Sequence, residues 1–239
     1  MIFNVKLADK YIQIESNSME LKDFFKNYLT ETDNPEFSIS CTQEEILAEQ
    51  EDVDISFSYD YLETLAVLRK LSDILPSKNR LLIHGASISY QGNAYLFSAP
   101  SGTGKSTHIR LWRKYLGTDV DIVNGDKPFV AIEEEVHIYG TPWAGKENWQ
   151  KNCRFPLAGI CFLQRGTKNS IRELSPAEVL PLILKQVYMP KNPFTVAQTL
   201  DLIDQLLKRV PCYLLSCDIS EEAVCCSFEK LTKISYPQK

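Results

Sequence analysis

The chain has 239 residues, of which 44% are hydrophobic and 24% charged, and its formal net charge is -5. This length and apolar content suffice for one large domain, or one domain with a small appendage, without stabilising metals or disulfides. The net negative charge argues against nonspecific electrostatic binding to nucleic acid or to an anionic membrane.

The N-terminus and the cysteines indicate the compartment. Residues 1–16 show no unbroken apolar stretch after their few charges, and no run of about 18 apolar residues occurs, so we expect no secretory signal, no membrane span and a cytoplasmic protein. The seven cysteines, an odd number, indicate reduced thiols. A zinc site is the alternative for Cys212, Cys217, Cys225 and Cys226, but paired zinc ligands usually have two to four residues between them.

The N-terminal part is predicted to be a small α+β unit. Apolar and polar positions alternate over 1–9, over 11–15 and again in "EFSISCT", as is typical of half-buried strands. The stretch "SMELKDFFKNYL" carries apolar residues at helical spacing, with Ser18 as its N-cap. The acidic segment 43–54 is predicted to be a solvated face or a loop.

A strong helical pattern over residues 60–75 is predicted to connect this unit with the main domain. Its leucines recur at helical spacing, and Pro76 ends it. The composition changes here, so we predict a small α+β N-terminal cap over 1–58 and a main domain over 59–239.

From residue 81 onwards, short β-rich runs alternate with turns and helices. The predicted strands are "LLIHGASISY", "NAYLFSA", "VDIVNGD", "PFVAIE", "EVHIYGT", "LAGICFLQR" and "CYLLSC". The predicted helices cover 105–116, 175–188, 196–209 and about 220–232. This order predicts an α/β fold with a mixed β-sheet rather than a strictly alternating βαβ series.

The stretch "LFSAPSGTGKSTHIRLW" (96–112) holds the strongest motif. A phosphate-binding loop follows G-x-x-x-x-G-K-[ST]; Gly104, Lys105 and Ser106 match it, whereas Ala99 replaces the first glycine. Alanine is tolerated there if its φ is negative. The motif predicts backbone N–H groups around the β-phosphate, a lysine on the β- and γ-phosphates and a hydroxyl on Mg²⁺. A chance glycine turn is the alternative. The predicted ATP-binding residues are Ala99, Pro100, Ser101, Gly102, Thr103, Gly104, Lys105, Ser106 and Thr107.

Asp126 and His84 are candidates for the second half of the site. Asp126 closes an apolar run about 20 residues after Lys105, where a metal-coordinating aspartate is expected, and with Ser106 it forms the predicted magnesium site. A turn aspartate is the alternative. His84 lies in an apolar strand predicted beside the loop strand, and is either a core histidine or an acceptor for a hydroxyl proton.

These residues resemble two families. The stretch "IHGASISYQGNAYLFSAPSGTGKST" is similar to a region of the HPr kinase/phosphorylase family, in which a His-Gly strand, a glycine turn and a strand lead into the phosphate loop. The "SGTGKS" core and the later Gly-Asp also resemble ATP-dependent phosphoenolpyruvate (PEP) carboxykinase, which shares that P-loop fold. Both families have two adjacent aspartates where this chain has Gly125–Asp126, which leaves open how metal binding and general-base catalysis are divided.

The resemblance extends more weakly beyond this region. The stretch "KNCRFPLAGI" resembles a carboxykinase segment, which implies Arg154 as a clamp on the γ-phosphate; a surface ion pair is the alternative. The segment 139–149, "YGTPWAGKENW", carries Lys146 and is either a mobile loop closing over phosphates or acceptor, or a plain surface loop. HPr kinases form rings, so the resemblance leaves a homo-oligomer open.

The resemblance as a whole implies a P-loop core of the HPr kinase/PEP carboxykinase type and a Mg²⁺/ATP-dependent kinase of the serine kinase type. Its acceptor would be a hydroxyl, preferably a serine of a peptide or protein, because the chain is much shorter than a carboxykinase and looks like small family members associated with peptide modification. A small-molecule hydroxyl kinase and a nucleotide-binding partner or sensor without phosphoryl transfer are the alternatives. The predicted catalytic residues are Asp126, His84, Lys105, Arg154 and Lys146.

Overall fold

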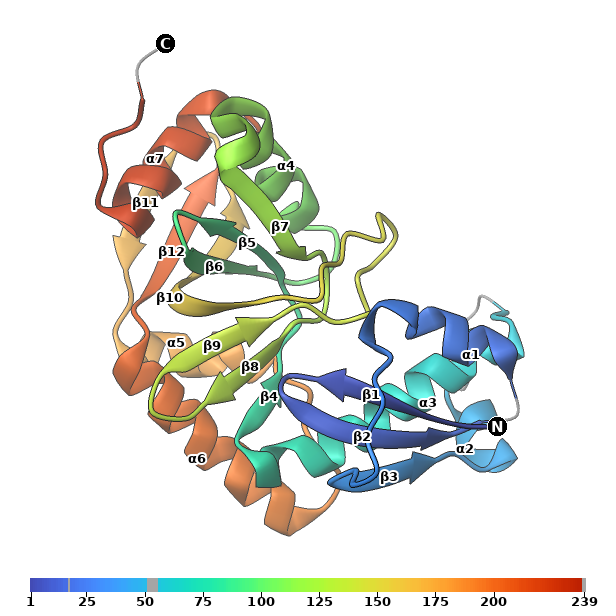
Figure 1. The fold of residues 1–239 in the computed structure, drawn as a ribbon. Coiled ribbons are helices and arrows are strands. Elements are labelled where there is room, and N and C mark those ends of the chain that lie inside the picture. The colour runs from blue at the N-terminus through green and yellow to red at the C-terminus, as the bar shows by residue number, and fades with distance from the viewer. Residues whose placement is uncertain (17, 51–55, 238–239) are drawn as a thin grey trace.

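The computed structural model describes residues 1–16, 18–50 and 56–237. Figure 1 shows an N-terminal lobe beside a larger lobe that is built on one curved β-sheet with helices on both faces. The sheet of the larger lobe contains parallel and antiparallel pairs, so the predicted α/β fold with a mixed sheet is confirmed. No helix in the described residues combines the length and the apolarity that crossing a membrane requires.

The N-terminal lobe is a small sheet covered by helices. Strands β1 and β2 are antiparallel, β3 adds to β2 in parallel, and Ser18 caps the first helix by accepting a hydrogen bond from the backbone N–H of Leu21 (3.3 Å). The elements are β1 (Ile2–Leu7), β2 (Lys10–Glu15), α1 (Met19–Phe24), the 3₁₀ turn η1 (Lys26–Tyr28), β3 (Phe37–Ser40), α2 (Gln43–Ala48) and α3 (Tyr59–Ile74).

Helix α3 belongs to the core between the lobes. Its Val67, Leu68 and Leu71 are buried in one apolar cluster with the strands of the N-terminal sheet, and Phe129 and Trp143 of the larger lobe join the same cluster. The two lobes therefore share a core, and the domain boundary at residue 58 stays a prediction.

The sheet of the larger lobe has nine strands among the described residues, in the order β4-β8-β9-β10-β6-β5-β7, with β12 beside β10 and β11 beside β12. The long strand β10 pairs antiparallel with β9 at its start and runs parallel to both β6 and β12 further along. The strands are β4 (Arg80–Leu82), β5 (Ala86–Tyr90), β6 (Asn93–Ser98), β7 (Val120–Asn124), β8 (Phe129–Ile132), β9 (Val136–Tyr139), β10 (Arg154–Arg165), β11 (Ser170–Glu173) and β12 (Cys212–Cys217).

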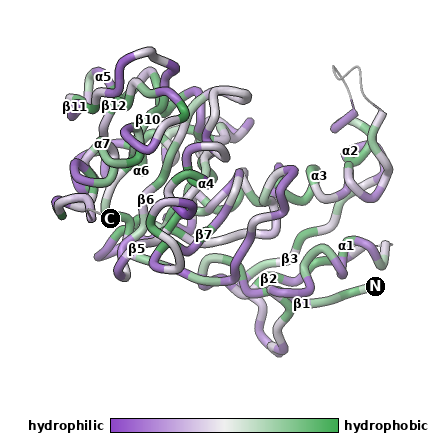
Figure 2. Tube along the Cα trace, turned by 90° about the horizontal axis from the view of Figure 1, so that it is seen from above, coloured by the Kyte–Doolittle hydropathy of each residue, from purple (hydrophilic) through white to green (hydrophobic). Residues whose placement is uncertain are grey.

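Helices cover both faces of this sheet. Along β6, Ala94 and Leu96 face the cluster packed under α5 and α6, whereas Tyr95 and Phe97 face the cluster under α4 and α7, as the two-residue period of a strand requires. Figure 2 shows hydrophobic stretches in both lobes. The remaining elements are η2 (Leu75–Lys78), α4 (Lys105–Leu116), η3 (Gly117–Asp119), α5 (Pro176–Ile183), α6 (Pro193–Arg209) and α7 (Glu221–Thr232).

The prediction of one strand over 81–90 is wrong at its centre, because His84 lies in a break between β4 and β5. The backbone N–H of His84 donates to the carbonyl of Gln186 (2.8 Å), so it leaves the sheet ladder. Gly85 permits the break: a Cβ there would lie 2.6 Å from Leu96 Cδ1 and 2.9 Å from the carbonyl of Phe97.

Other elements refine or correct the predictions. The first part of the acidic segment, predicted to be a solvated face or a loop, is the exposed face of helix α2, which Thr42 and Glu45 start with a capping box and which buries only Ile46; residues 51–54 of this segment lie outside the described residues. Strand β11, with the short sequence "SIRE", was not predicted and gains its order from pairing with β12. Helix α5 ends at Ile183 rather than at residue 188.

Trp143 packs between residues of the two lobes. Its ring lies 5.6 Å from Phe24, 5.4 Å from Phe25 and 6.2 Å from Phe129, and its indole N–H donates to the carbonyl of Thr64 (3.0 Å). Because removal of a buried tryptophan leaves a large cavity, we expect Trp143→Ala to lower the free energy of unfolding by about 3–5 kcal/mol in urea denaturation.

The matched control is Trp149→Ala, since Trp149 lies on the same segment but is only half-buried. We expect Trp149→Ala to lower the free energy of unfolding clearly less than Trp143→Ala does. Equal losses for the two variants would contradict the role given to Trp143.

Candidate active site

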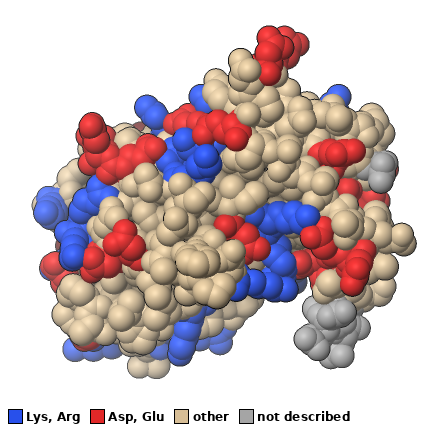
Figure 3. All heavy atoms as spheres, turned by 90° about the horizontal axis from the view of Figure 1, so that it is seen from below, with Lys and Arg blue, Asp and Glu red and all other residues tan. Residues whose placement is uncertain are grey.

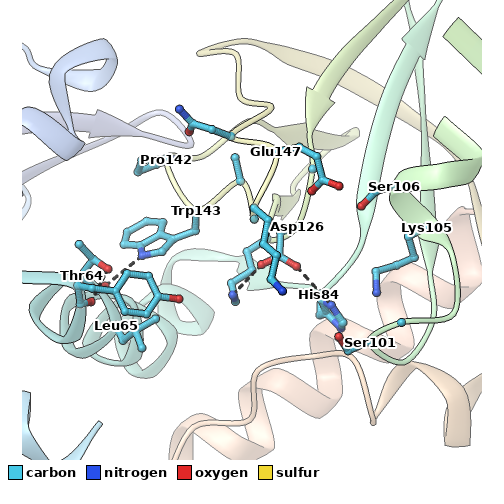
Figure 4. A pocket seen from close by; sticks show the side chains of 18 of the residues that line it. Thr64, Leu65, His84, Ser101, Lys105, Ser106, Asp126, Pro142, Trp143 and Glu147 are labelled. Carbon is cyan, nitrogen blue, oxygen red and sulfur yellow. Dashed lines mark hydrogen bonds and ion pairs between the residues drawn. The ribbon is translucent and has the colours of Figure 1, made fainter. Parts of the chain in front are cut away.

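A cavity of about 730 Å³ lies where the two lobes meet, a size typical of ligand sites. The larger lobe contributes His84 and residues of three segments, 101–107, 125–127 and 142–148, and the N-terminal lobe contributes side chains of α1 and α3. Figure 4 shows Lys105 and Ser106 on one side of the cavity and Asp126 in its middle. Thr64, Leu65 and Trp143 lie on the other side. Most of the predicted site residues therefore meet in one place.

The glycine-rich loop owes its shape to two glycines. Gly102 has φ +76° and Gly104 has φ +120°, conformations that L side chains rarely adopt. Ala99 is buried and has no positive φ, so the condition under which alanine replaces the first glycine is met. The loop residues that line the cavity are Ser101, Gly102, Gly104, Lys105, Ser106 and Thr107; Ala99, Pro100 and Thr103 do not line it.

Helix α4 begins at the cavity with an uncompensated positive end. No side chain caps it, and its first turn contains no acidic residue. The first N–H groups of a helix have no partner within the helix, and its dipole favours an anion at this end. Since α4 starts at Lys105 and Ser106, both in the lining, the cavity offers an anion a helix N-terminus.

Lys105 is buried within the loop that it follows. Its ammonium group donates to the carbonyls of Ala99 (2.8 Å) and Pro100 (3.4 Å). Burial lowers the pKa of Lys105, while the charge of Asp126 raises it and that of Lys127 lowers it. A cation this poorly solvated gains from an anion in the cavity.

Asn124, at the end of β7, sets the position of Asp126. Its side-chain oxygen accepts from the backbone N–H groups of Asp126 (2.9 Å) and Lys127 (2.8 Å), while its amide donates to the carbonyl of Thr141 (2.9 Å). The carbonyl of Asp126 accepts from the N–H of Gly85 (2.8 Å). These bonds bring Asp126 to the strand break that holds His84.

The carboxylate of Asp126 lies between two basic side chains. One oxygen is 3.4 Å from Nε2 of His84 and the other 2.8 Å from Nζ of Lys127. Burial raises the pKa of Asp126, but the hydrogen bonds and charges of His84 and Lys127 outweigh it and hold the pKa at about 2. Nδ1 of His84 lies 2.9 Å from the side-chain oxygen of Gln186, which fixes the ring.

Lys127 and Gln186 were not predicted as site residues. Lys127 follows Asp126 directly, so the "GDK" sequence already indicated that its side chain could lie beside the carboxylate. Gln186 is 102 residues from His84 in the chain, and no local pattern marks it.

The structure does not bring Arg154 to the cavity. Its exposed guanidinium pairs with Asp9 of the N-terminal lobe (2.9 Å). Arg165, at the other end of β10, donates instead to the carbonyl of Gly102 in the glycine-rich loop (2.6 Å). The two arginines are 11 positions apart on β10, which corresponds to roughly 35 Å of strand, so only one end of β10 lies at the loop.

Lys146 lies in a segment that is fixed at both ends. The backbone N–H of Lys127 donates to the carbonyl of Trp143 (3.1 Å), and that of Gly125 donates to the carbonyl of Trp149 (2.9 Å). Residues 141–144 are buried and only 145–148 are exposed. The segment forms a wall of the cavity, with Lys146 in its exposed part.

Figure 3 shows acidic and basic side chains side by side over one face of the molecule, so that face carries no broad area of a single charge sign. Among the described residues, no group of three or more His, Cys, Asp or Glu side chains is arranged to hold a metal ion.

No family model and no curated protein matches this sequence. Among solved structures, the chain is similar to the Hpr(Ser) kinase/phosphatase from Coxiella burnetii, with 11% sequence identity and a TM-score of 0.37 over 64% of this chain and 93% of that chain. A likeness of this size carries no argument about function, which therefore rests on the residues of the cavity.

The low pKa of Asp126 makes the fold sensitive to acid. Because its folded-state pKa is about 2, below the ordinary 3.8, the unfolded chain binds more protons between these pH values and stability falls as the pH falls through them. The shift corresponds to about 2 kcal/mol. We expect urea unfolding to show that Asp126→Asn loses less stability than the wild type between pH 5 and pH 2.5.

The control is Asp119→Asn, at an exposed position directly before β7. It should keep the pH dependence of the wild type. An unchanged pH dependence in Asp126→Asn would contradict the ionised, paired state of this carboxylate.

Proposed function

We propose that the protein is a Mg²⁺/ATP-dependent kinase that transfers the γ-phosphoryl group to a hydroxyl. One observation carries the proposal: the uncapped N-terminus of α4, the buried Lys105 and the ionised Asp126 line the same cavity. Phosphoryl transfer relies on positioning and charge rather than on covalent chemistry of the protein, and this cavity offers both.

The phosphates of ATP would lie along the glycine-rich loop. The N–H groups of residues 101–106 would be the donors for the β-phosphate, apart from that of Thr103, which donates to the carbonyl of Pro100 (3.3 Å). Lys105 would exchange its carbonyl partners for phosphate oxygens. Arg165 and Lys146 are further cations at the loop and in the cavity lining.

The residues present fit a magnesium ion. Mg²⁺ prefers oxygen ligands and usually takes only one or two from the protein, with phosphates and water completing its shell. Ser106 and Asp126 supply a hydroxyl and an ionised carboxylate to the same cavity, so we assign the metal to them. Bound there, Mg²⁺ would neutralise charge on the phosphates, and Lys127 would give up its pairing with Asp126.

One aspartate cannot serve at once as metal ligand and as general base. A carboxylate whose pKa is about 2 is a good ligand and a weak base. We therefore assign Asp126 to the metal and acceptance of the hydroxyl proton to Nε2 of His84, which would lose its pairing with Asp126 when the metal binds, while Gln186 holds the ring at Nδ1. The acceptor oxygen forms a bond to the γ-phosphorus, the bond to the bridging oxygen breaks, and ADP leaves with the electron pair.

A second candidate function is nucleotide binding without transfer, as in a partner or sensor protein. It is favoured by the pairing of both Asp126 oxygens with His84 and Lys127, which compete with a metal for the same carboxylate. Detection of phosphoryl transfer to any hydroxyl would exclude it.

Lys105 tests the nucleotide site. Because Lys105 is the buried cation of the loop, we expect Lys105→Ala to weaken Mg-ATP binding at least about 100-fold in calorimetric titration, while thermal unfolding shows a retained fold. Lys114→Ala is the control, since Lys114 is exposed on the same helix and bonds only to Tyr115 among the contacts described. Equal ATP affinity in Lys105→Ala and the wild type would remove the proposal.

His84 tests the assignment of the base. Loss of a positioned general base lowers a rate by about 10²–10⁴-fold, so His84→Asn should lower kcat by this factor and leave the KM for ATP within about threefold. Single-turnover transfer from labelled ATP measures the step. A kcat close to that of the wild type would mean that Asp126 or water, and not His84, accepts the proton.

A further inference from the structure

The cavity has a second wall, which the phosphate loop and Asp126 do not use. Figure 4 shows Thr64, Leu65, Pro142 and Trp143 across Asp126 from Lys105 and Ser106. Phe24 of α1 and Tyr61 of α3 also line the cavity. A group seated against this wall would lie beyond Asp126 as seen from the loop, on the side from which an acceptor approaches the γ-phosphate.

The wall is uncharged, and its polar groups are mostly occupied. The hydroxyl of Thr64 donates to the carbonyl of Tyr61 (2.7 Å), and the indole N–H of Trp143 donates to the carbonyl of Thr64 (3.0 Å). Lys105, Lys127 and Lys146, the cations of the lining, belong to the segments that carry the loop, Asp126 and the exposed rim. The wall therefore offers rings, aliphatic carbon and one phenol to an acceptor.

The wall is also held in place before any ligand binds. Trp143 packs edge-on against Phe24 (5.6 Å between ring centroids), and the hydrogen bond to Thr64 ties it to α3. Tyr61 remains 45% exposed and Leu65 half-buried, so apolar surface is left for a ligand to cover. A preformed apolar surface binds an apolar group at little cost in ordering.

From this wall we infer the class of acceptor: a peptide in which an apolar or aromatic side chain stands next to the phosphorylated hydroxyl. The neighbouring side chain would cover Tyr61 and Leu65 while the hydroxyl reaches the γ-phosphate near His84. A polyol does not fit this wall, because its unpaired hydroxyl groups would lose their hydration there. The inference rests on the proposed kinase function.

The test uses the full chain, Mg²⁺, γ-labelled ATP and short peptides with a single serine in an alanine background. The residue beside the serine is Phe, Leu, Asp or Lys, and glycerol and glucose 6-phosphate serve as small acceptors. We expect kcat/KM for the Phe and Leu peptides to exceed that for the Asp and Lys peptides at least about tenfold, the usual worth of an apolar contact.

The matched variants are Tyr61→Ala and Tyr59→Ala. Both tyrosines are exposed on the first turns of α3, by 45% and 43%, but only Tyr61 lines the cavity. Tyr61→Ala should reduce the preference for the Phe peptide to less than about threefold, whereas Tyr59→Ala should keep it.

Three results would overturn the inference. Equal use of all peptides, or a preference for the charged ones, excludes an apolar subsite. Phosphorylation of glycerol or glucose 6-phosphate but of no peptide moves the acceptor to another class. Binding of Mg-ATP without transfer to any acceptor contradicts the peptide acceptor but is consistent with the nucleotide site. Absence of Mg-ATP binding contradicts the proposed function as well.

Discussion

The buried side chain of Asn124 holds together the segments on which the cavity depends. It accepts from the N–H groups of Asp126 and Lys127 and donates to the carbonyl of Thr141, so the end of β7 and the segment that begins with Thr141 are fixed to each other. A side-chain oxygen that accepts from the backbone two and three residues ahead defines a tight turn, here over residues 124–127. The position of Asp126 in the cavity follows from that turn.

The same segment couples the two lobes. Trp143, two residues after Thr141, is buried among the rings of Phe24, Phe25 and Phe129 and bonds to α3. The wall that faces the glycine-rich loop is therefore built on the core that joins the lobes.

Much of the site was visible in the sequence because it lies in local patterns. The loop at 101–107 has a strand before it and a helix after it, and Asp126 follows an apolar strand. The partners of these residues were harder to predict. Gln186 meets His84 through tertiary packing, and the strand break at His84 depends on the close approach of Gly85 to β6.

For Arg154 the sequence pattern pointed to a residue that the structure places away from the cavity. Its neighbours resemble a known phosphate-binding segment, but the residue stands at the start of β10, and the parallel pairing of β10 with β6 places the other end of the strand, with Arg165, beside the loop. A short sequence match does not say which end of a strand reaches a site, whereas strand direction and register do.

A structure with Mg²⁺ and a non-hydrolysable ATP analogue tests the central claim most directly. The account predicts the β-phosphate within hydrogen-bond distance of the backbone N–H groups of 101–106, the metal on Ser106 and Asp126, and Lys105 turned from the carbonyls of Ala99 and Pro100 to the phosphates. An analogue bound elsewhere, or phosphates that leave Lys105 on its carbonyls, would contradict it.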